Sequence, residues 1–185
     1  MYEEFLEDGQ NRMEGAVRAL EGDLATFQTG RANPALLDRL AIEAYGDTLS
    51  IKQMAVVSVP EPQQLAIRPF DASTIGAIEK AILKSDLGLT PNNDGKLIRL
   101  NIPPLTEERR VRLTKQINKR VEDGKIAIRN IRRDVQNDLR DMKSEKLITE
   151  DELKDAQDKL QKLTDTYVSK LEELGKAKSS EVMKL

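Results

Sequence analysis

Apolar residues recur at heptad spacing in three long stretches of the chain, and each stretch predicts an amphipathic helix. The first covers residues 1–28, with apolar positions at Leu6, Met13, Val17, Leu20, Leu24 and Phe27. The second covers residues 106–145, with Leu113, Ile117, Val121, Gly124, Ile128, Ile131, Val135, Leu139 and Met142. The third begins at Thr149, with Leu153, Ala156, Leu160, Leu163, Tyr167, Leu171 and Leu174. Because no single helix can bury its own apolar face, the three together predict a three-helix bundle.

Residues next to two of these stretches predict where the helices begin. Thr106 precedes two glutamates and can cap the second helix, since acidic side chains suit the first turn. Thr149 and Glu152 have the spacing of a capping box at the start of the third helix. Only the short segment 144–149 separates these two helices, so we expect them to be antiparallel.

Residues 31–104 differ from the rest of the chain in having short β-rich runs separated by glycine and proline. The predicted strands are Ala41–Tyr45, Leu49–Met54, Val56–Val59, Leu65–Phe70 and Leu97–Ile102. One helix is predicted from Ile75 to Leu87, with Asp71 or Ser73 as its cap. The fold class is therefore α+β: a bundle formed by residues 1–30 and 105–185, with a small α+β domain of residues 31–104 inserted into it.

Two chain crossings join the predicted domains. Gly30 and Arg31 form the first crossing, and Pro103, Pro104 and Leu105 form the second. Glycine loosens the first crossing, whereas two prolines stiffen the second. We therefore expect a hinge that lets the inserted domain swing along a restricted path. The alternative is a static, packed interface between the two domains.

The composition excludes several classes of chemistry. The chain has no cysteine and no histidine, which removes disulfides, thiolate nucleophiles, histidine relays and most zinc sites. The segment 92–95 contains acidic and amide side chains beside a glycine, but it lacks the ligand spacing of an EF-hand and is predicted as a turn. No base is evident next to a nucleophile. We therefore expect no metal, no cofactor and no enzymatic activity.

Charge is distributed unevenly along the chain although its net value is only −2. Residues 1–30 carry seven acidic and two basic side chains, whereas residues 105–145 carry twelve basic and eight acidic ones. At 100° per residue, one flank of the second helix collects the cations Lys125, Arg129, Arg132, Arg133 and Arg140. Arg132 lies nearest the apolar seam. Such a flank suits a phosphate backbone, and the alternative is an ordinary solvated face.

Several long segments of this sequence resemble bacterial ribosome recycling factors. These segments occur in the family's order and are distributed over the whole chain. They are Gly30-Arg31-Ala32-Asn33-Pro34-Ala35-Leu36-Leu37, Ser85-Asp86-Leu87-Gly88-Leu89, Ile102-Pro103-Pro104-Leu105-Thr106-Glu107-Glu108-Arg109-Arg110, Ala127-Ile128-Arg129-Asn130-Ile131-Arg132-Arg133-Asp134 and Gln161-Lys162-Leu163-Thr164-Asp165.

The resemblance implies an L-shaped protein in which a long three-helix bundle carries a β/α/β sandwich on a two-stranded hinge. It also implies a task after peptide release. Family members bind across the A and P regions of the large ribosomal subunit, and with elongation factor G and GTP they split the ribosome into subunits. The bundle contacts ribosomal RNA, and the translocase pushes on the swinging domain. We expect a monomer in the cytoplasm, with no membrane partner.

The resemblance also indicates which residues bind the ribosome. It implies that Arg132 contacts ribosomal RNA with Arg129 beside it, and that Arg31 and Gly30 act at the bundle tip. Arg133, Lys125 and Arg140 share the flank by periodicity alone, so contact and solvation both stay open for them. Two departures from the family pattern are Gln28, where a basic residue is usual, and Ala44, where an aromatic residue is usual.

Two other classes of function are compatible with parts of the sequence. A coiled-coil adaptor would explain the heptads, but it has no use for the inserted domain or the two prolines of the second crossing. An enzyme is disfavoured by the missing base. The N-terminal residues are acidic and do not resemble a signal or transit peptide, which favours the cytoplasm.

Overall fold

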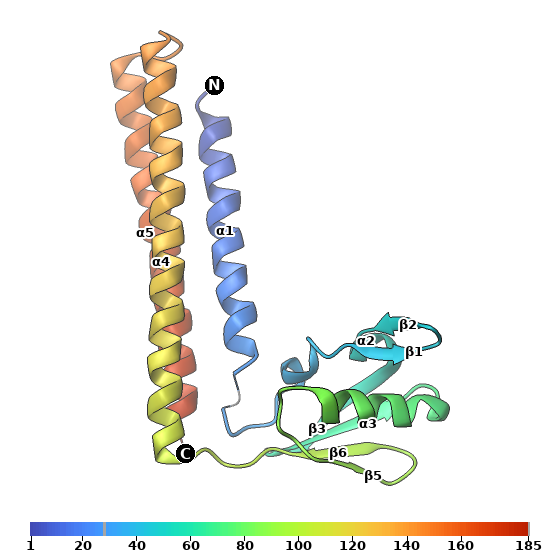
Figure 1. The fold of residues 1–185 in the computed structure, drawn as a ribbon. Coiled ribbons are helices and arrows are strands. Elements are labelled where there is room, and N and C mark those ends of the chain that lie inside the picture. The colour runs from blue at the N-terminus through green and yellow to red at the C-terminus, as the bar shows by residue number, and fades with distance from the viewer. Residues whose placement is uncertain (28, 185) are drawn as a thin grey trace. The chain divides into compact units, whose positions relative to one another are not determined.

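The computed structural model describes residues 1–27 and 29–184, which form two compact units. The helical unit comprises Met1–Leu24 and Arg110–Leu185, and the mixed unit comprises Ala25–Arg109. Figure 1 shows the long helices of the first unit and the strands of the second. The prediction of an α+β fold with long helices and a small antiparallel sheet is confirmed. The exact limits predicted for the domains, at residues 30 and 105, stay a prediction.

Three long helices make up the helical unit. They are α1 (Glu3–Ala25), α4 (Glu107–Ser144) and α5 (Glu150–Met183). Thr106 begins α4 as predicted, because its Oγ1 accepts a hydrogen bond from the backbone N–H of Arg109 at 3.2 Å. At the start of α5, Thr149 and Glu152 form the predicted capping box. The chain reverses between the two helices, so α4 and α5 run antiparallel (Figure 1).

The core of the helical unit follows the predicted apolar seams, with a small shift on α5. Leu153, Ala156, Leu160, Tyr167 and Leu171 are buried as expected. Leu163 and Leu174 are only half-buried, whereas their neighbours Thr164 and Gly175 are buried. Thr164 tolerates burial because its hydroxyl donates to the carbonyl of Leu160 at 2.8 Å.

Glycines allow the helices of this unit to approach closely. A Cβ added at Gly9 of α1 would lie 2.8 Å from Cγ2 of Val135 on α4. A Cβ added at Gly124 of α4 would lie 3.1 Å from Cδ1 of Leu171 on α5. Glycine therefore costs helix propensity at these positions, but it provides the space that the facing apolar side chain fills.

The mixed unit contains two antiparallel sheets and one principal helix. The two-stranded sheet pairs β1 (Ile42–Ala44) with β2 (Asp47–Leu49). The four-stranded sheet has the order β3-β4-β6-β5, formed by Ala55–Glu61, Gln64–Pro69, Ile98–Asn101 and Pro91–Asn93 respectively. Helix α3 (Ile75–Lys84) contacts both β1 and β5, and its buried Ile78 and Ile82 join the core of this unit.

The edges of the four-stranded sheet are β3 and β5. The pairing of β3 with β4 shifts register between Ser58 and Glu61, and Pro60 lies within this irregular part. Strand β5 is three residues long and begins with Pro91. Both edge strands are therefore irregular or short.

The short elements of this unit differ in part from the predictions. The strand predicted at Leu49–Met54 is wrong beyond Leu49, which ends β2, because Ser50 and Gln53 form a capping box that starts the one-turn helix α2 (Ile51–Met54). The predicted turn at 92–95 overlaps strand β5, which includes Asn92 and Asn93. The remaining elements are two 3-10 helices, η1 (Pro34–Leu37) and η2 (Ala72–Thr74).

The limits of α3 also differ slightly from the predicted ones. The helix ends at Lys84 rather than at Leu87, because the N–H and hydroxyl of Ser85 both bond to the carbonyl of Ile82. Asp71 caps η2, directly before α3, by accepting a hydrogen bond from the N–H of Ser73 at 3.0 Å. Within the described residues, no helix has the combination of length and apolar composition needed to cross a bilayer.

Candidate nucleic-acid interface

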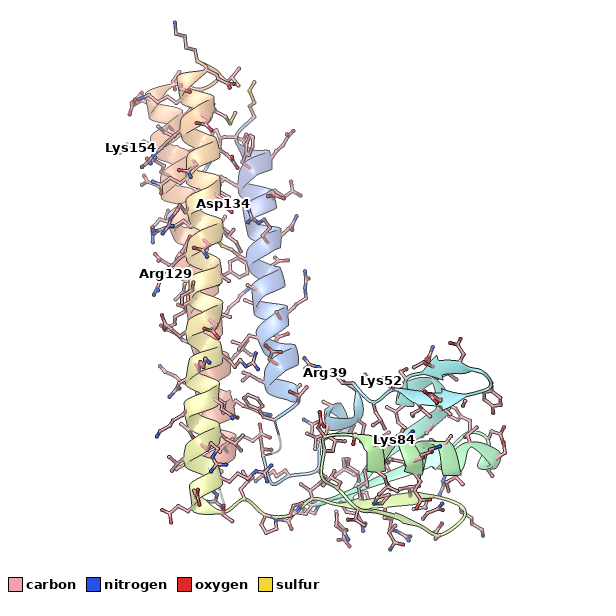
Figure 2. All side chains as sticks on the ribbon, in the orientation of Figure 1. Arg39, Lys52, Lys84, Arg129, Asp134 and Lys154 are labelled. Atoms are coloured by element: carbon pink, nitrogen blue, oxygen red, sulfur yellow. The ribbon has the colours of Figure 1, made fainter. Side chains whose placement is uncertain are left out.

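The cationic flank predicted for residues 106–145 lies along α4. Arg129, Arg133 and Arg140 are exposed, whereas Lys125 and Arg132 are half-buried. In Figure 2, Arg129 points away from α1, while Asp134 lies on the side of α4 that faces α1. Asp134 forms an ion pair there with Arg12 of α1, with 2.8 Å between Oδ2 of Asp134 and Nη2 of Arg12. Asp134 is therefore engaged by α1, whereas Arg129 pairs with Glu122 of its own helix.

Arg132 is held at the seam between α4 and α5. Its Nε is buried and has no hydrogen-bond partner among the residues that the structure describes. Its Nη1 donates a hydrogen bond to Oε1 of Gln161 on α5 at 3.1 Å. The inner part of the side chain is thus packed, and the end of the guanidinium group is fixed by an uncharged acceptor.

Gln161 is itself oriented by a neighbour on α5. Its Nε2 donates to Oδ1 of Asp165 at 2.9 Å. A carboxylate can only accept, so this bond fixes the side-chain amide with its oxygen toward Arg132. The three residues form a chain from Asp165 through Gln161 to Arg132.

Two other cations of the flank are paired with carboxylates. Lys125 Nζ lies 2.9 Å from Oε1 of Glu172 on α5, and the lysine side chain is 19% exposed. The hydrogen bond from Lys125 lowers the pKa of Glu172 below its ordinary value. Arg129 Nη1 lies 3.4 Å from Oε1 of Glu122 on the same helix, and both side chains are exposed. Water screens such an exposed pair, so a stronger anion can replace the glutamate at low cost.

Arg133 and Arg140 differ from these residues. Neither has an ion-pair or hydrogen-bond partner within residues 1–27 and 29–184. The flank thus contains free cations, carboxylate-paired cations and, in Arg132, a cation held by a neutral amide. A fixed guanidinium without a countercharge can give a phosphate two parallel, charge-assisted hydrogen bonds.

The residues predicted at the two crossings lie in the mixed unit, whereas Arg132 lies in the helical unit. Gly30 is buried with a φ of +79°, in the region that favours glycine, and Arg31 beside it is exposed. Pro103 and Pro104 are exposed, and Leu105 is buried.

Both crossings are attached to the turn between β3 and β4. The N–H of Ala32 donates to the carbonyl of Pro62 at 2.8 Å. The N–H of Ile102 donates to the carbonyl of Gln63, also at 2.8 Å. The first bond follows Gly30-Arg31 directly, and the second precedes Pro103-Pro104 directly. The chain is therefore held by the sheet up to the edges of both predicted hinge segments.

The two departures from the family pattern have different outcomes. Gln28 lies outside the described residues. Ala44 is the last residue of β1 and is half-buried against the core of the mixed unit. The aromatic residue that is absent here would therefore have contributed to packing at this position.

Gln161 and Asp165 are the functional candidates that reasoning from the sequence did not assign. Their four-residue spacing on α5 places them on one helix face, but nothing in the sequence shows that this face meets Arg132. The described residues include no group of three or more acidic side chains arranged to hold a metal ion.

Comparison with known proteins identifies the family. The family model described as "Ribosome recycling factor" matches residues 20–183. The chain is 54% identical to the ribosome-recycling factor of Roseiflexus castenholzii and 48% identical to that of Bacillus subtilis, with complete coverage of both chains in each case.

Two solved structures give the same result. The solution structure of a ribosome recycling factor has a TM-score of 0.82 and 37% identity, and the match covers 100% of this chain and 98% of the other. The second structure has a TM-score of 0.70 and 41% identity, with 99% of each chain covered. That structure comprises models of the T. thermophilus ribosome recycling factor and E. coli elongation factor G bound to the E. coli post-termination complex. The chain belongs to the ribosome recycling factor family, whose members are non-enzymatic translation factors.

Proposed function

We propose that this protein acts in the cytoplasm as a monomer that splits post-termination ribosomes into subunits, together with elongation factor G and GTP. The relative from T. thermophilus, which is described bound to a post-termination complex with elongation factor G, is 41% identical to this chain. Splitting would free the subunits from messenger RNA for a new round of translation.

The assignment of the RNA-binding surface rests on the contacts of Arg132. It is fixed at the α4–α5 seam, and its acceptor Gln161 leaves its positive charge uncompensated. We assign Arg132 as the principal contact to ribosomal RNA of the large subunit, in the A and P region. Arg129 contributes beside it, since its exposed glutamate partner is easily displaced.

The remaining flank residues contribute less. Arg133 is exposed without a partner and adds long-range attraction for phosphate. Lys125 is 19% exposed and paired with Glu172, so its contribution depends on breaking that pair. Arg31, together with Gly30, forms a second contact that is carried by the mixed unit.

The hinge comprises Gly30 and Arg31 in one strand and Pro103, Pro104 and Leu105 in the other. The backbone bonds from Ala32 and Ile102 fix the chain up to these residues on the sheet side. Rotation of the mixed unit is then confined to the two short segments. Proline keeps φ near about −65°, so one of the segments also limits the direction of movement.

The energy for splitting comes from the partner. The sequence contains no Gly-x-x-x-x-Gly-Lys-Ser/Thr loop for binding nucleotide phosphates. We therefore assign GTP hydrolysis to elongation factor G and the mechanical step to this chain. The bundle holds ribosomal RNA while the translocase moves the mixed unit, and the anchored helices then disrupt the bridges between the ribosomal subunits.

Light scattering of post-termination bacterial ribosomes tests this function. The expected result is a fall in scattering that requires the protein, elongation factor G and GTP together. Omission of any one of the three is the control, as is GDP in place of GTP. If scattering does not fall and the protein does not bind large subunits, the splitting function is wrong and a coiled-coil adaptor becomes the better explanation.

A further inference from the structure

The bond between Arg132 and Gln161 differs in kind from the other contacts of the cationic flank. Lys125 and Arg129 are paired with carboxylates, which offset their charge. Arg132 is instead bonded to the amide oxygen of Gln161 at 3.1 Å. An amide restricts the guanidinium group sterically and through one hydrogen bond, but it leaves the full positive charge available.

Two features restrict the side chain of Arg132 before any ligand arrives. Its Nε is buried, so the inner part of the side chain cannot rotate without leaving its packed position. Its Nη1 is fixed by Gln161, which is in turn oriented by Asp165 at 2.9 Å. A long side chain that is already ordered loses less conformational freedom when it binds.

We propose that Gln161 is a positioning residue that holds Arg132 ready for RNA without neutralising it, and that Asp165 orients Gln161 for this purpose. The inference rests on the proposed role of Arg132 in binding ribosomal RNA. It means that a residue of α5, Gln161, supports the binding of RNA by a residue of α4, Arg132. Asp165 lies one turn beyond Gln161 and accepts a hydrogen bond from its amide nitrogen, and the described residues show no ion pair between Asp165 and Arg132.

Two substitutions at residue 161 separate orientation from charge. Gln161→Met keeps the length of the side chain but removes the acceptor, so Arg132 is charged and less restricted. We expect affinity for large ribosomal subunits to fall roughly two- to tenfold, the cost of ordering one long side chain on binding, with an unchanged dependence on salt.

Gln161→Glu keeps an acceptor and adds a charge that neutralises Arg132. We expect affinity to fall by about tenfold or more, as for loss of a hydrogen bond to a charged group. The slope of log K against log salt should also decrease in magnitude by about one phosphate contact. A residue with only a structural role would not produce this change, since a charged acceptor would bind Arg132 at least as firmly.

Gln116→Glu is the matched control for the added charge. Gln116 is exposed on α4, and it lies about 160° around that helix from Arg132 at 100° per residue. It should lower affinity only slightly and leave the salt slope unchanged. All variants should unfold at temperatures close to that of the unsubstituted protein.

A double-mutant cycle with Arg132→Ala completes the test. In the Arg132→Ala background, Gln161→Met should have no further effect, and Gln161→Glu should do no more than Gln116→Glu. If Arg132→Ala weakens binding but both substitutions at Gln161 leave affinity and salt slope unchanged, the positioning role is wrong and the RNA contact stands. If Arg132→Ala itself binds as tightly as the unsubstituted protein, the RNA contact and the positioning role are both overturned.

Discussion

Val121 of α4 lies against Gly175 of α5 so closely that a Cβ added at Gly175 would stand 2.5 Å from Cγ2 of Val121. Real side chains do not approach to this distance, so the two helices depend on the absence of a side chain at this position. Gly22 of α1 is the opposite case, because a Cβ added there would meet no atom within 4 Å.

The first prediction therefore compares these two glycines. Gly175→Ala should lower the free energy of unfolding by about 1–3 kcal/mol, the usual cost of overpacking, less any gain in helix propensity. Gly22→Ala should raise it by about 0.5–1 kcal/mol, because alanine favours the helix and meets no neighbour. Urea unfolding measures both, and Val121→Ala should relieve the cost of Gly175→Ala. Equal effects of the two substitutions would contradict the close contact.

The second prediction concerns acid stability and the pair of Tyr167 and Glu14. Tyr167 donates a hydrogen bond to Oε1 of Glu14 at 2.8 Å, and Gln10 donates to the same oxygen at 3.4 Å. These two bonds lower the pKa of Glu14 below its ordinary 4.5, and the bond from Tyr167 has the larger effect. A carboxylate with a lowered folded-state pKa contributes stability above its unfolded pKa and loses it as the pH falls through the folded value.

Tyr167→Phe should therefore raise the pKa of Glu14 toward 4.5. The fall in melting temperature between pH 7 and about pH 3 should be smaller in this variant than in the unsubstituted protein. NMR titration of the Glu14 carboxyl carbon gives the pKa directly. Tyr45→Phe is the control, because its hydroxyl donates to Asp71 in the other unit. An unchanged Glu14 titration in Tyr167→Phe would show that the bond does not form in solution.

The third prediction concerns the RNA contact. Arg132→Ala should weaken binding to large ribosomal subunits by about 1–3 kcal/mol, and it should reduce the salt slope by about one phosphate contact. Lys119→Ala is the matched control, since Lys119 is exposed and lies about 140° around α4 from Arg132. Fluorescence-detected binding at several salt concentrations measures both quantities. A large fall in melting temperature, without a change in salt slope, would make Arg132 a structural residue.

The fourth prediction concerns the hinge. Replacing Pro103 and Pro104 together by glycine removes the restriction on φ at both positions. Binding to large subunits should be unchanged, because Arg132 lies in the other unit, whereas splitting by elongation factor G should be several-fold slower. Stopped-flow light scattering measures the rate, and Pro91→Gly in β5 is the control. Splitting at the original rate would exclude a directional role for the two prolines.

Sequence reasoning reached the long helices because their periodicity extends over many turns and their caps agree with it. Thr149 and Glu152 are an example, since local side-chain chemistry alone sets the start of α5. The short elements were harder. Ser50 and Gln53 form a capping box that starts the helix α2 within an apolar, β-rich run. The hydrophobic pattern of the run gives no indication of these hydrogen bonds.

The candidate site shows the same division. The position of Arg132 near the apolar seam follows from helical periodicity, and the structure finds it half-buried there. The bond to Gln161 could not be predicted, because it depends on how α4 and α5 are aligned along each other. That alignment is set by packing, including the contact between Gly124 and Leu171, and no local pattern encodes it.

The edges of the four-stranded sheet bear on how the protein behaves when it is concentrated. An open sheet edge can add a strand from a second copy and so begin aggregation. Here one edge is interrupted by a register shift beside Pro60, and the other consists of three residues that begin with Pro91. Proline lacks the N–H that an added strand would need. The four-stranded sheet therefore offers a second copy little regular edge on which to pair, which suits the movement on the ribosome that we propose for this unit.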